Sequence, residues 1–358
     1  MDTKKPVIGQ NSSLGKTINS YRFYLLILIM MIMGIFVRNF FSAFNMKGIF
    51  DSTVLYAMLG LGFTTCMVAG HMDLSVGAMA NMGAVLTMGM HTLSGRGWAF
   101  SITVAVIAGL FVGFLNGILV SKAKIHSFIT TLGMQFVLRG AMYIYCGGAE
   151  IGDKGDFAFA DFLNMKLGFL PLSPKVVFVL LFVIAVAFLM RNTRWGRNIY
   201  LIGGNEESAW LAGIKRDAMT ISVFALSGMA CAIGGAIFAI CQSSALPNLG
   251  EKGISPLLVA LAATIIGGTA TSGGKGSVWN TYASVYGLMV MSNVLTSLSG
   301  KYEVQILSNG LVLAACVVYE TITNYFRSKR IGERALLLEE LSRGEPQRPS
   351  RAGGLGSG

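Results

Sequence analysis

Asp73 is an acidic residue between two long apolar runs, in the stretch Ala69-Gly70-His71-Met72-Asp73-Leu74-Ser75-Val76-Gly77. A carboxylate in a membrane-buried position costs about 2.5–3.5 kcal/mol on insertion scales, so it needs a hydrogen-bonding partner or contact with water. Two roles suit it. Asp73 can cap the following helix by accepting its free backbone N–H groups. Alternatively, a turn formed by Gly70, Asp73, Ser75 and Gly77 can act as a gate, and both roles can hold together.

A second polar stretch, from Arg194 to Ile214, contains the signals of a short helix. Gly203 and Gly204 end the preceding structure, Asn205 is a suitable N-cap, and Gly213 is a suitable C-terminal stop. The residues that define this helix are Asn205, Glu206, Glu207, Ser208, Trp210, Leu211 and Gly213. We expect its apolar side chains to be exposed and interpret it as a docking surface for a cytoplasmic partner. The alternative is a helix lying in the lipid interface.

A third stretch, from Ala262 to Ser277, is rich in glycine and superficially suggests a phosphate-binding loop. Five residues separate Gly268 from Gly274-Lys275, whereas the Walker A motif requires about four, and Gly276 stands where Ser or Thr should follow the lysine. We therefore expect no nucleotide site, and we assign Gly267, Gly268, Gly273 and Gly274 to a second gate or turn. Because the sequence also has no His-Glu-x-x-His motif and no buried Ser–Lys or Asp pair, we predict no catalytic residue, metal site or cofactor in this chain.

The composition indicates where these three stretches are placed. Apolar residues make up 53% of the chain and charged residues only 13%, against about 25% charged in soluble globular proteins. The 45 glycines suit helices that approach closely in lipid. The net charge of +11 comes from cations in short loops and tails, with no zinc spacing or helix-turn-helix pattern, so nucleic-acid binding is excluded.

Apolar runs long enough for a membrane helix, about 20 residues, predict an all-α membrane protein with about ten transmembrane helices. The predicted segments are 21–37, 53–70, 74–91, 98–120, 128–146, 175–190, 218–241, 255–271, 280–298 and 303–323. The first is interpreted as a retained helix, because it lacks the cleavage site of a signal peptide. The weakest divisions are the glycine-rich turns after residues 70 and 271.

The distribution of lysine and arginine predicts the orientation of these segments. With the N terminus inside, the inner stretches hold 16 of these residues and the outer stretches hold 8. Cations concentrate on the cytoplasmic side of membrane proteins, so both ends of the chain are predicted to be cytoplasmic. The domains are then a cytoplasmic tail over 1–20, a transmembrane domain over 21–323 and a second cytoplasmic tail over 324–358. The last residues resemble a low-complexity tail or residues added by cloning.

Five cysteines lie in or beside the apolar segments: Cys66, Cys146, Cys231, Cys241 and Cys316. An odd number without close spacing argues against a disulfide framework or a metal site. We interpret them as small buried apolar residues. Cys146 and Cys241 both fall near the predicted outer surface, where a disulfide between them is the remaining alternative.

Polar and aromatic side chains inside the apolar segments are candidates to line a pathway for a solute. The main candidates are Asn81, Asn116, Gln135, Tyr282 and Asn293, and further ones are Arg139, Tyr143, Tyr145, Asn280, Tyr286 and Asn309. Amides and aromatic faces suit the hydroxyl groups of sugars. Each candidate has an ordinary alternative, because a buried asparagine often joins two helices and a tyrosine often lies at the membrane interface.

Together, the three stretches resemble the permease subunits of ATP-binding-cassette importers of the ribose, xylose and galactose group. The family's Gly-Asp-type motif matches 69–77, its Asn-Gly and Phe-Ile motifs match 116–120 and 128–133, and its cytoplasmic and late glycine-rich segments match 196–214 and 262–278. The likeness runs from about residue 50 to 320. The sequence departs from the family at Leu257-Leu258-Val259-Ala260-Leu261-Ala262-Ala263, where many sugar permeases carry two acids, and His71 replaces a glycine.

The resemblance implies the fold of a type II importer permease in the bacterial inner membrane. Two permease subunits, as a homodimer or a heterodimer, would form the pathway, and two cytoplasmic ATPases carrying ATP and Mg²⁺ would dock on 205–213. An extracytoplasmic binding protein would deliver the solute, and ATP binding would turn the pathway from inward- to outward-facing. The expected solute is a monosaccharide. The alternatives are a nucleoside, autoinducer-2 or branched-chain amino acid permease of the same superfamily, or a secondary transporter driven by an ion gradient.

Overall fold

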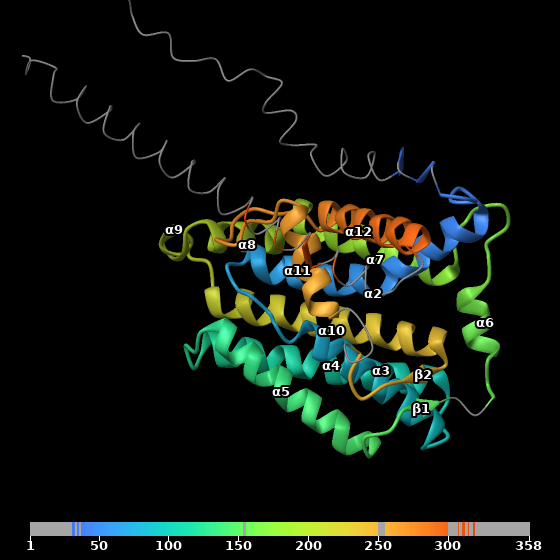
Figure 1. The fold of residues 1–358 in the computed structure, drawn as a ribbon. Coiled ribbons are helices and arrows are strands. Elements are labelled where there is room, and N and C mark those ends of the chain that lie inside the picture. Colours follow the sequence, from blue (N-terminus) through green and yellow to red (C-terminus); the bar gives the residue numbers. More distant parts are fainter. Residues whose placement is uncertain are drawn as a thin grey trace, which may run out of the picture. The chain divides into compact units, whose positions relative to one another are not determined.

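The computed structural model describes residues 31–32, 34–35, 37–152, 155–249 and 255–299, together with 307, 310, 311, 314 and 318. Most of these residues are helical, and the long helices pack into one bundle (Figure 1). The bundle belongs to a compact unit that runs to Leu313, and Ala314 and Val318 belong to a second unit. The predicted segments 21–37 and 303–323 lie largely outside the described residues, and the tails 1–20 and 324–358 lie wholly outside them.

The centre of the bundle consists of α2 (Ala43–Val68), α3 (Val76–Thr92) and α10 (Arg216–Gln242), which pack against one another. Most side chains of these three helices are buried. Small residues allow close packing of α10 on its neighbours: a Cβ atom added at Gly83 of α3 would lie 2.6 Å from the Cα of Ala232. Such close approach of backbones is the way membrane helices gain van der Waals contact without a hydrophobic driving force.

The outer helices are α4 (Trp98–Ser121), α5 (Ser127–Cys146), α7 (Pro174–Asn192) and α12 (Val278–Ser299). Large apolar side chains remain exposed on all four of them, among them Phe111, Phe136, Leu181, Phe188 and Leu298. Among the described residues, α2, α4, α7 and α10 have both the length and the apolar composition needed to cross a membrane. The exposed apolar surface therefore suits lipid or a second membrane subunit.

Shorter elements lie at the two ends of the bundle (Figure 1). One end carries α8 (Arg194–Gly204) and α9 (Glu206–Leu211), and we call it the α9 end. The opposite end carries α6 (Ala158–Asn164) and a two-stranded antiparallel ladder of β1 (Ile151–Gly152) and β2 (Ser244–Ala245), and we call it the α6 end. In this ladder Ile151 pairs with Ala245 and Gly152 with Ser244.

Most predicted segments coincide with helices to within a few residues; 98–120, for example, corresponds to Trp98–Ser121. Two boundaries were wrong. The first helix of the core begins at Ala43 rather than at residue 53, because the Ser42 side chain caps it and Lys47 pairs with Asp51 one turn on, over 2.7 Å. Hydropathy had hidden this polar first part of the helix.

The second wrong boundary concerns the predicted membrane segment 255–271. The observed helix, α11, covers only Pro256–Ile266 and ends where Gly268 adopts a φ of 83°. Its 11 residues span about 16 Å, roughly half of the hydrocarbon thickness. The remainder of the predicted segment forms the glycine-rich turn.

Candidate functional site

The short helix α9 forms where the sequence predicts it. The side-chain oxygen of Asn205 accepts a hydrogen bond from the backbone N–H of Ser208 over 2.9 Å, as an N-cap should. Beyond the helix, Gly213 has a φ of 75°, a left-handed conformation that favours glycine. Trp210 and Leu211 are 72% and 74% exposed, so the helix presents two large apolar side chains away from the protein.

The helix that precedes it, α8, was not predicted. Thr193 caps it by accepting from the backbone N–H of Gly196 over 3.3 Å, and Ile199 and Ile202 are buried beneath it. On its other side the hydroxyl of Tyr200 donates to the carbonyl oxygen of Gly276 over 2.8 Å. From the sequence we expect only that Gly203 and Gly204 end a preceding structure, whose type is not assigned. The apolar spacing of its isoleucines, leucine and tryptophan was the signal that could have revealed an amphipathic helix.

The end of α8 meets two other glycine-rich segments at one point, which we call the glycine junction. It consists of Gly70, Gly203, Gly204, Gly273 and Gly274. The backbone N–H of Gly274 donates to the carbonyl oxygen of Val68 over 2.8 Å. A Cβ atom added at Gly203 would overlap that same oxygen, and one added at Gly273 would lie 2.9 Å from the Cα of Gly70. The three polar stretches of the sequence therefore converge here.

Positive φ angles explain why glycine occupies the two turns of this junction. Gly70 has a φ of 85°, Gly273 of 84° and Gly274 of 72°. Gly268 also has a positive φ, of 83°, but no neighbour lies within 4 Å of a Cβ atom added to it. Gly267 instead packs against the backbone of α12, where an added Cβ would lie 2.9 Å from the nitrogen of Thr281.

Asp73 is fully buried in the break between α2 and α3 and belongs to a hydrogen-bond network. One carboxylate oxygen accepts from the backbone N–H of Ser75 over 3.1 Å and from its hydroxyl over 2.6 Å. The other oxygen accepts from the hydroxyl of Ser227 in α10 over 2.7 Å. The amide of Asn116 in α4 donates to the hydroxyl of Ser75 over 3.0 Å. The network thus ties the start of α3 to α4 and α10.

The backbone of this break also depends on side chains of α5. Ser127 accepts from the N–H of Met72 over 3.3 Å, and Thr131 accepts from the N–H of Leu74 over 3.0 Å. His71 lies within hydrogen-bonding distance of Thr220, at 3.2 Å. Burial of its ring, with the Arg216 guanidinium nearby, lowers the pKa of His71 to about 4. The imidazole is therefore neutral at physiological pH.

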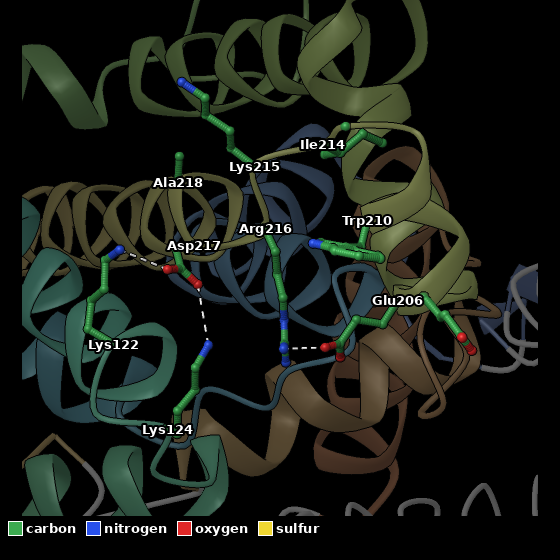
Figure 2. Close-up of a pocket in the computed structure, with 11 residues that line it drawn as sticks. Lys122, Lys124, Glu206, Trp210, Ile214, Lys215, Arg216, Asp217 and Ala218 are labelled. Atoms are coloured by element: carbon green, nitrogen blue, oxygen red, sulfur yellow. Dashed lines mark hydrogen bonds and ion pairs between the residues drawn. The ribbon is translucent and has the colours of Figure 1, made fainter.

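A cavity of about 850 Å³ lies between α9 and the starts and ends of the long helices (Figure 2). Asp217, in the first turn of α10, accepts from Lys122 over 2.8 Å and forms a longer ion pair with Lys124 at 3.5 Å. Arg216 forms an ion pair with Glu206 of α9. Charged side chains thus connect α9 to α10, and α10 to the end of α4.

The pathway candidates occupy several different environments. Asn81, Gln135 and Arg139 line one small cavity of about 60 Å³. Asn116 belongs to the Asp73 network, and Tyr282 packs partly buried against the core. Asn293 forms a reciprocal amide pair with Asn45 of α2, over 3.1 and 2.9 Å, and so joins two helices.

The further candidates are also separated. Tyr286 stacks on Phe50 with ring centroids 5.0 Å apart, the Arg139 guanidinium lies 5.9 Å from the ring of Tyr143, and Tyr145 packs against Gly89. Asn280 lies in the first turn of α12 beside Gly267, and Asn309 lies outside the described residues. Cys66, Cys146, Cys231 and Cys241 are free thiols, and Cys316 lies outside the described residues.

One charged cluster was missed by the sequence reasoning. At the α6 end, the side chain of Lys175 is only 8% exposed, and its ammonium lies 3.3 Å from the carboxylate of Asp51. Lys175 also donates to Asn164 of α6 over 2.5 Å, and Ser173 donates to the other oxygen of Asp51 over 2.5 Å. Because the two charges are far apart in the chain, no local pattern indicated that they pair.

Comparison with known proteins identifies the family. Residues 45–319 match the family described as the permease component of the branched-chain amino acid transport system. The chain belongs to this family. It is a multi-pass membrane protein and the permease subunit of an ATP-binding-cassette importer, which confirms the resemblance inferred from the motifs.

Two similar proteins are named for different solutes. The chain is 30% identical to the ribose import permease protein RbsC of Haemophilus influenzae over 327 residues, which is 90% of this chain and 98% of the relative. It is 32% identical to the autoinducer 2 import system permease protein LsrC of Yersinia pseudotuberculosis over 289 residues, 81% of this chain and 80% of the relative. No solved structure matches the chain.

Proposed function

We propose that this permease imports a monosaccharide and that α9 is the point at which ATP-driven motion enters it. The observation that carries the proposal is the glycine junction. It joins the helix immediately before α9 to the break after α2 and to the turn after α11. A displacement of α9 would therefore be passed on by direct backbone contact, both to the break after α2 and to the turn after α11.

The surface of α9 suits a protein partner. Trp210 and Leu211 are exposed, and aromatic side chains of this kind are common anchors of protein interfaces. The Asn205 cap and the ion pair between Glu206 and Arg216 hold the helix against α10. We propose that a cytoplasmic ATPase, carrying ATP and Mg²⁺, docks here, so that this chain itself holds no cofactor.

The proposed topology has about ten membrane helices with both chain ends in the cytoplasm. Basic residues support placing the α9 end inside: Lys122, Lys124, Arg194, Arg197, Lys215 and Arg216 lie in the short segments of this end. The segment leading to α6 carries Glu150 and Asp156, and α6 itself carries Asp161. This asymmetry follows the positive-inside rule. Two such permeases, identical or different, would form the pathway, and a solute-binding protein would dock at the α6 end.

The choice of a monosaccharide rests on the relatives and on the polar groups inside the bundle. The curated relatives are named for ribose and for autoinducer 2, and Gln135 and Asn81 supply amide groups at one cavity. A second candidate is a branched-chain amino acid, because the family description names that solute class. An amino acid would need a charged partner for its carboxylate, and Arg139 lines the same cavity, so the solutes for which the relatives are named decide the choice.

Co-purification tests the docking role of α9. The permease is expressed with its neighbouring subunits and isolated from detergent extracts as wild type, as Trp210→Ala and as Phe169→Ala. Phe169, in the loop after α6, is 88% exposed and serves as the matched control for loss of an exposed ring. We expect the ATPase to be lost with Trp210→Ala and retained with Phe169→Ala. Retention of the ATPase after deletion of residues 204–213 would contradict the proposal.

A further inference from the structure

Helix α5 combines exposed apolar side chains with two polar residues inside its length. It packs against α3 and α4, yet Phe136, Val137 and Ile144 on it are largely exposed. Its 20 residues would span about 30 Å, enough to cross the hydrocarbon core. Gln135 and Arg139 interrupt the middle and the outer half of this helix.

Arg139 is the residue of this helix whose charge is most costly to place in lipid. It is exposed, and it lies seven residues before the helix end at Cys146, which places it about 10 Å inside that end. A guanidinium facing hydrocarbon at such depth costs on the order of 2.5–3.5 kcal/mol on insertion scales. We therefore expect its side chain to face water or protein in the assembled transporter.

Arg139 and Gln135 share one cavity with Asn81, Asn248 and Ser255, which come from α3 and from the segment that leads into α11. The amide of Asn81 is already used by backbone: it donates to the carbonyl oxygen of Pro247 over 2.5 Å and accepts from the N–H of Leu249 over 3.1 Å. The carbonyl oxygen of the Gln135 side chain is buried and has no hydrogen-bond partner within the described residues.

We propose that Gln135 and Arg139 bind hydroxyl groups of a neutral polyhydroxylated solute, such as a pentose, as it crosses the membrane. The inference rests on the proposed function, because it places this cavity on the pathway of the importer. A guanidinium offers five N–H donors and no acceptor, while a glutamine amide offers both. Together they match hydroxyl groups, each of which donates and accepts.

The size of the cavity defines what it can hold in this conformation. Its volume of about 60 Å³ corresponds to roughly two water molecules at about 30 Å³ each. A monosaccharide does not fit in that space, so its binding would require the walls of the cavity to move apart. The wall formed by Asn248 and Ser255 precedes α11, and α11 ends in the turn that contributes to the glycine junction. Movement at the junction would therefore shift one wall of this site.

Two substitutions of Arg139 distinguish a neutral solute from an anionic one. Arg139→Gln keeps hydrogen-bond donors but removes the charge, whereas Arg139→Met keeps the length and removes both. For a neutral polyol we expect Arg139→Gln to retain most uptake and Arg139→Met to lose about tenfold, which corresponds to about 1.4 kcal/mol and so to the loss of one or two hydrogen bonds. For an amino acid carboxylate both variants should lose uptake alike. Gln135→Leu should resemble Arg139→Met.

The experiment measures uptake of radiolabelled pentoses, hexoses and leucine by the complete importer in proteoliposomes, together with ATP hydrolysis stimulated by the binding protein. Arg96→Gln, in the exposed loop between α3 and α4, is the matched control. Sugar uptake that is retained in Arg139→Gln and lost in Arg139→Met, with stimulated ATP hydrolysis intact in both, supports the site. Equal uptake in wild type, Arg139→Met and Gln135→Leu overturns it, as does uptake of leucine without any sugar. Absence of the ATPase from the wild-type complex would instead overturn the proposed function.

Discussion

The backbone N–H of Gly274 donates to the carbonyl oxygen of Val68 over 2.8 Å, and these two residues stand 206 positions apart in the chain. Val68 is the last residue of α2, and its carbonyl has no further turn of helix to bind. The glycine turn after α11 supplies the missing donor. Gly203 occupies the remaining space at this oxygen, so that α8, α2 and the turn after α11 are in backbone contact.

Gly203→Ala should disrupt this contact, while Gly204→Ala should not. A Cβ atom at Gly203 would overlap the oxygen of Val68, whereas one at Gly204 would lie 3.9 Å from the Cα of Gly274, an ordinary contact. Overpacking against backbone costs roughly 1–3 kcal/mol. We expect a lower thermal midpoint in detergent and reduced uptake for Gly203→Ala, with Gly204→Ala close to wild type. Equal thermal midpoints and equal uptake rates of the two variants would contradict the role given to the junction.

Asp73→Ala should destabilise the break between α2 and α3 more than Ser227→Ala does. The alanine at position 73 leaves the N–H and hydroxyl of Ser75 without their acceptor, and the hydroxyl of Ser227 without its own. Each buried polar group left unpaired costs about 1–3 kcal/mol. Asp73→Asn keeps one oxygen for Ser75 and should fall between them. Thermal unfolding in detergent gives this order, and an unaltered Asp73→Ala would contradict the structural role.

Substitution of Asn293 should affect stability rather than solute choice. Its amide is engaged with Asn45 in both directions, so it joins α12 to α2 and has little free capacity for a solute. Hydrogen bonds between membrane helices average about 0.6 kcal/mol, with a maximum near 1.7 kcal/mol. We expect Asn293→Ala to lower the thermal midpoint slightly and to leave the ratio of uptake rates for two sugars unchanged. A changed ratio of uptake rates would indicate that Asn293 lines the solute pathway.

The cap of α9 should be needed for docking. Asn205→Ala removes the acceptor of the Ser208 N–H, at a cost of about 1 kcal/mol, whereas Asn205→Ser retains a capping oxygen. We expect weaker binding of the ATPase to the alanine variant and near-normal binding to the serine variant. Titration of the purified permease in nanodiscs with the ATPase measures both affinities. Identical affinities for all three proteins would mean that the partner itself orders this segment.

Features governed by local sequence were predicted well. The Asn205 cap and the Gly213 stop depend on a few neighbouring residues, and long apolar runs marked α4 and α10. Features that depend on distant residues were not predicted. The pairing of Asp51 with Lys175 and the meeting of Gly203 with Val68 arise only when the helices pack. The partial helix α11 was also missed, because its apolar run continues past the glycines that end it.

The functional residues show the same difference between features set by local sequence and features set by distant residues. Asp73 was expected to cap α3 by accepting its free backbone N–H groups. It accepts instead from the N–H of Ser75, the residue before α3, and from two hydroxyl groups, so it closes the turn that leads into the helix. The sequence could not separate Asn293, which joins two helices, from Gln135, which faces a cavity. An asparagine and a glutamine inside apolar segments have the same pattern, and only the packed neighbours distinguish them.

Measuring which energy source drives uptake tests the central claim most directly. The permease, its ATPase and its binding protein are reconstituted in proteoliposomes, and uptake of the solute that the binding protein carries is measured with and without ATP. Each condition is repeated with an ionophore that removes all ion gradients. We predict that uptake requires ATP, persists with the ionophore and is lost in Trp210→Ala. Uptake that continues without ATP and collapses with the ionophore would contradict an ATP-driven importer coupled through α9.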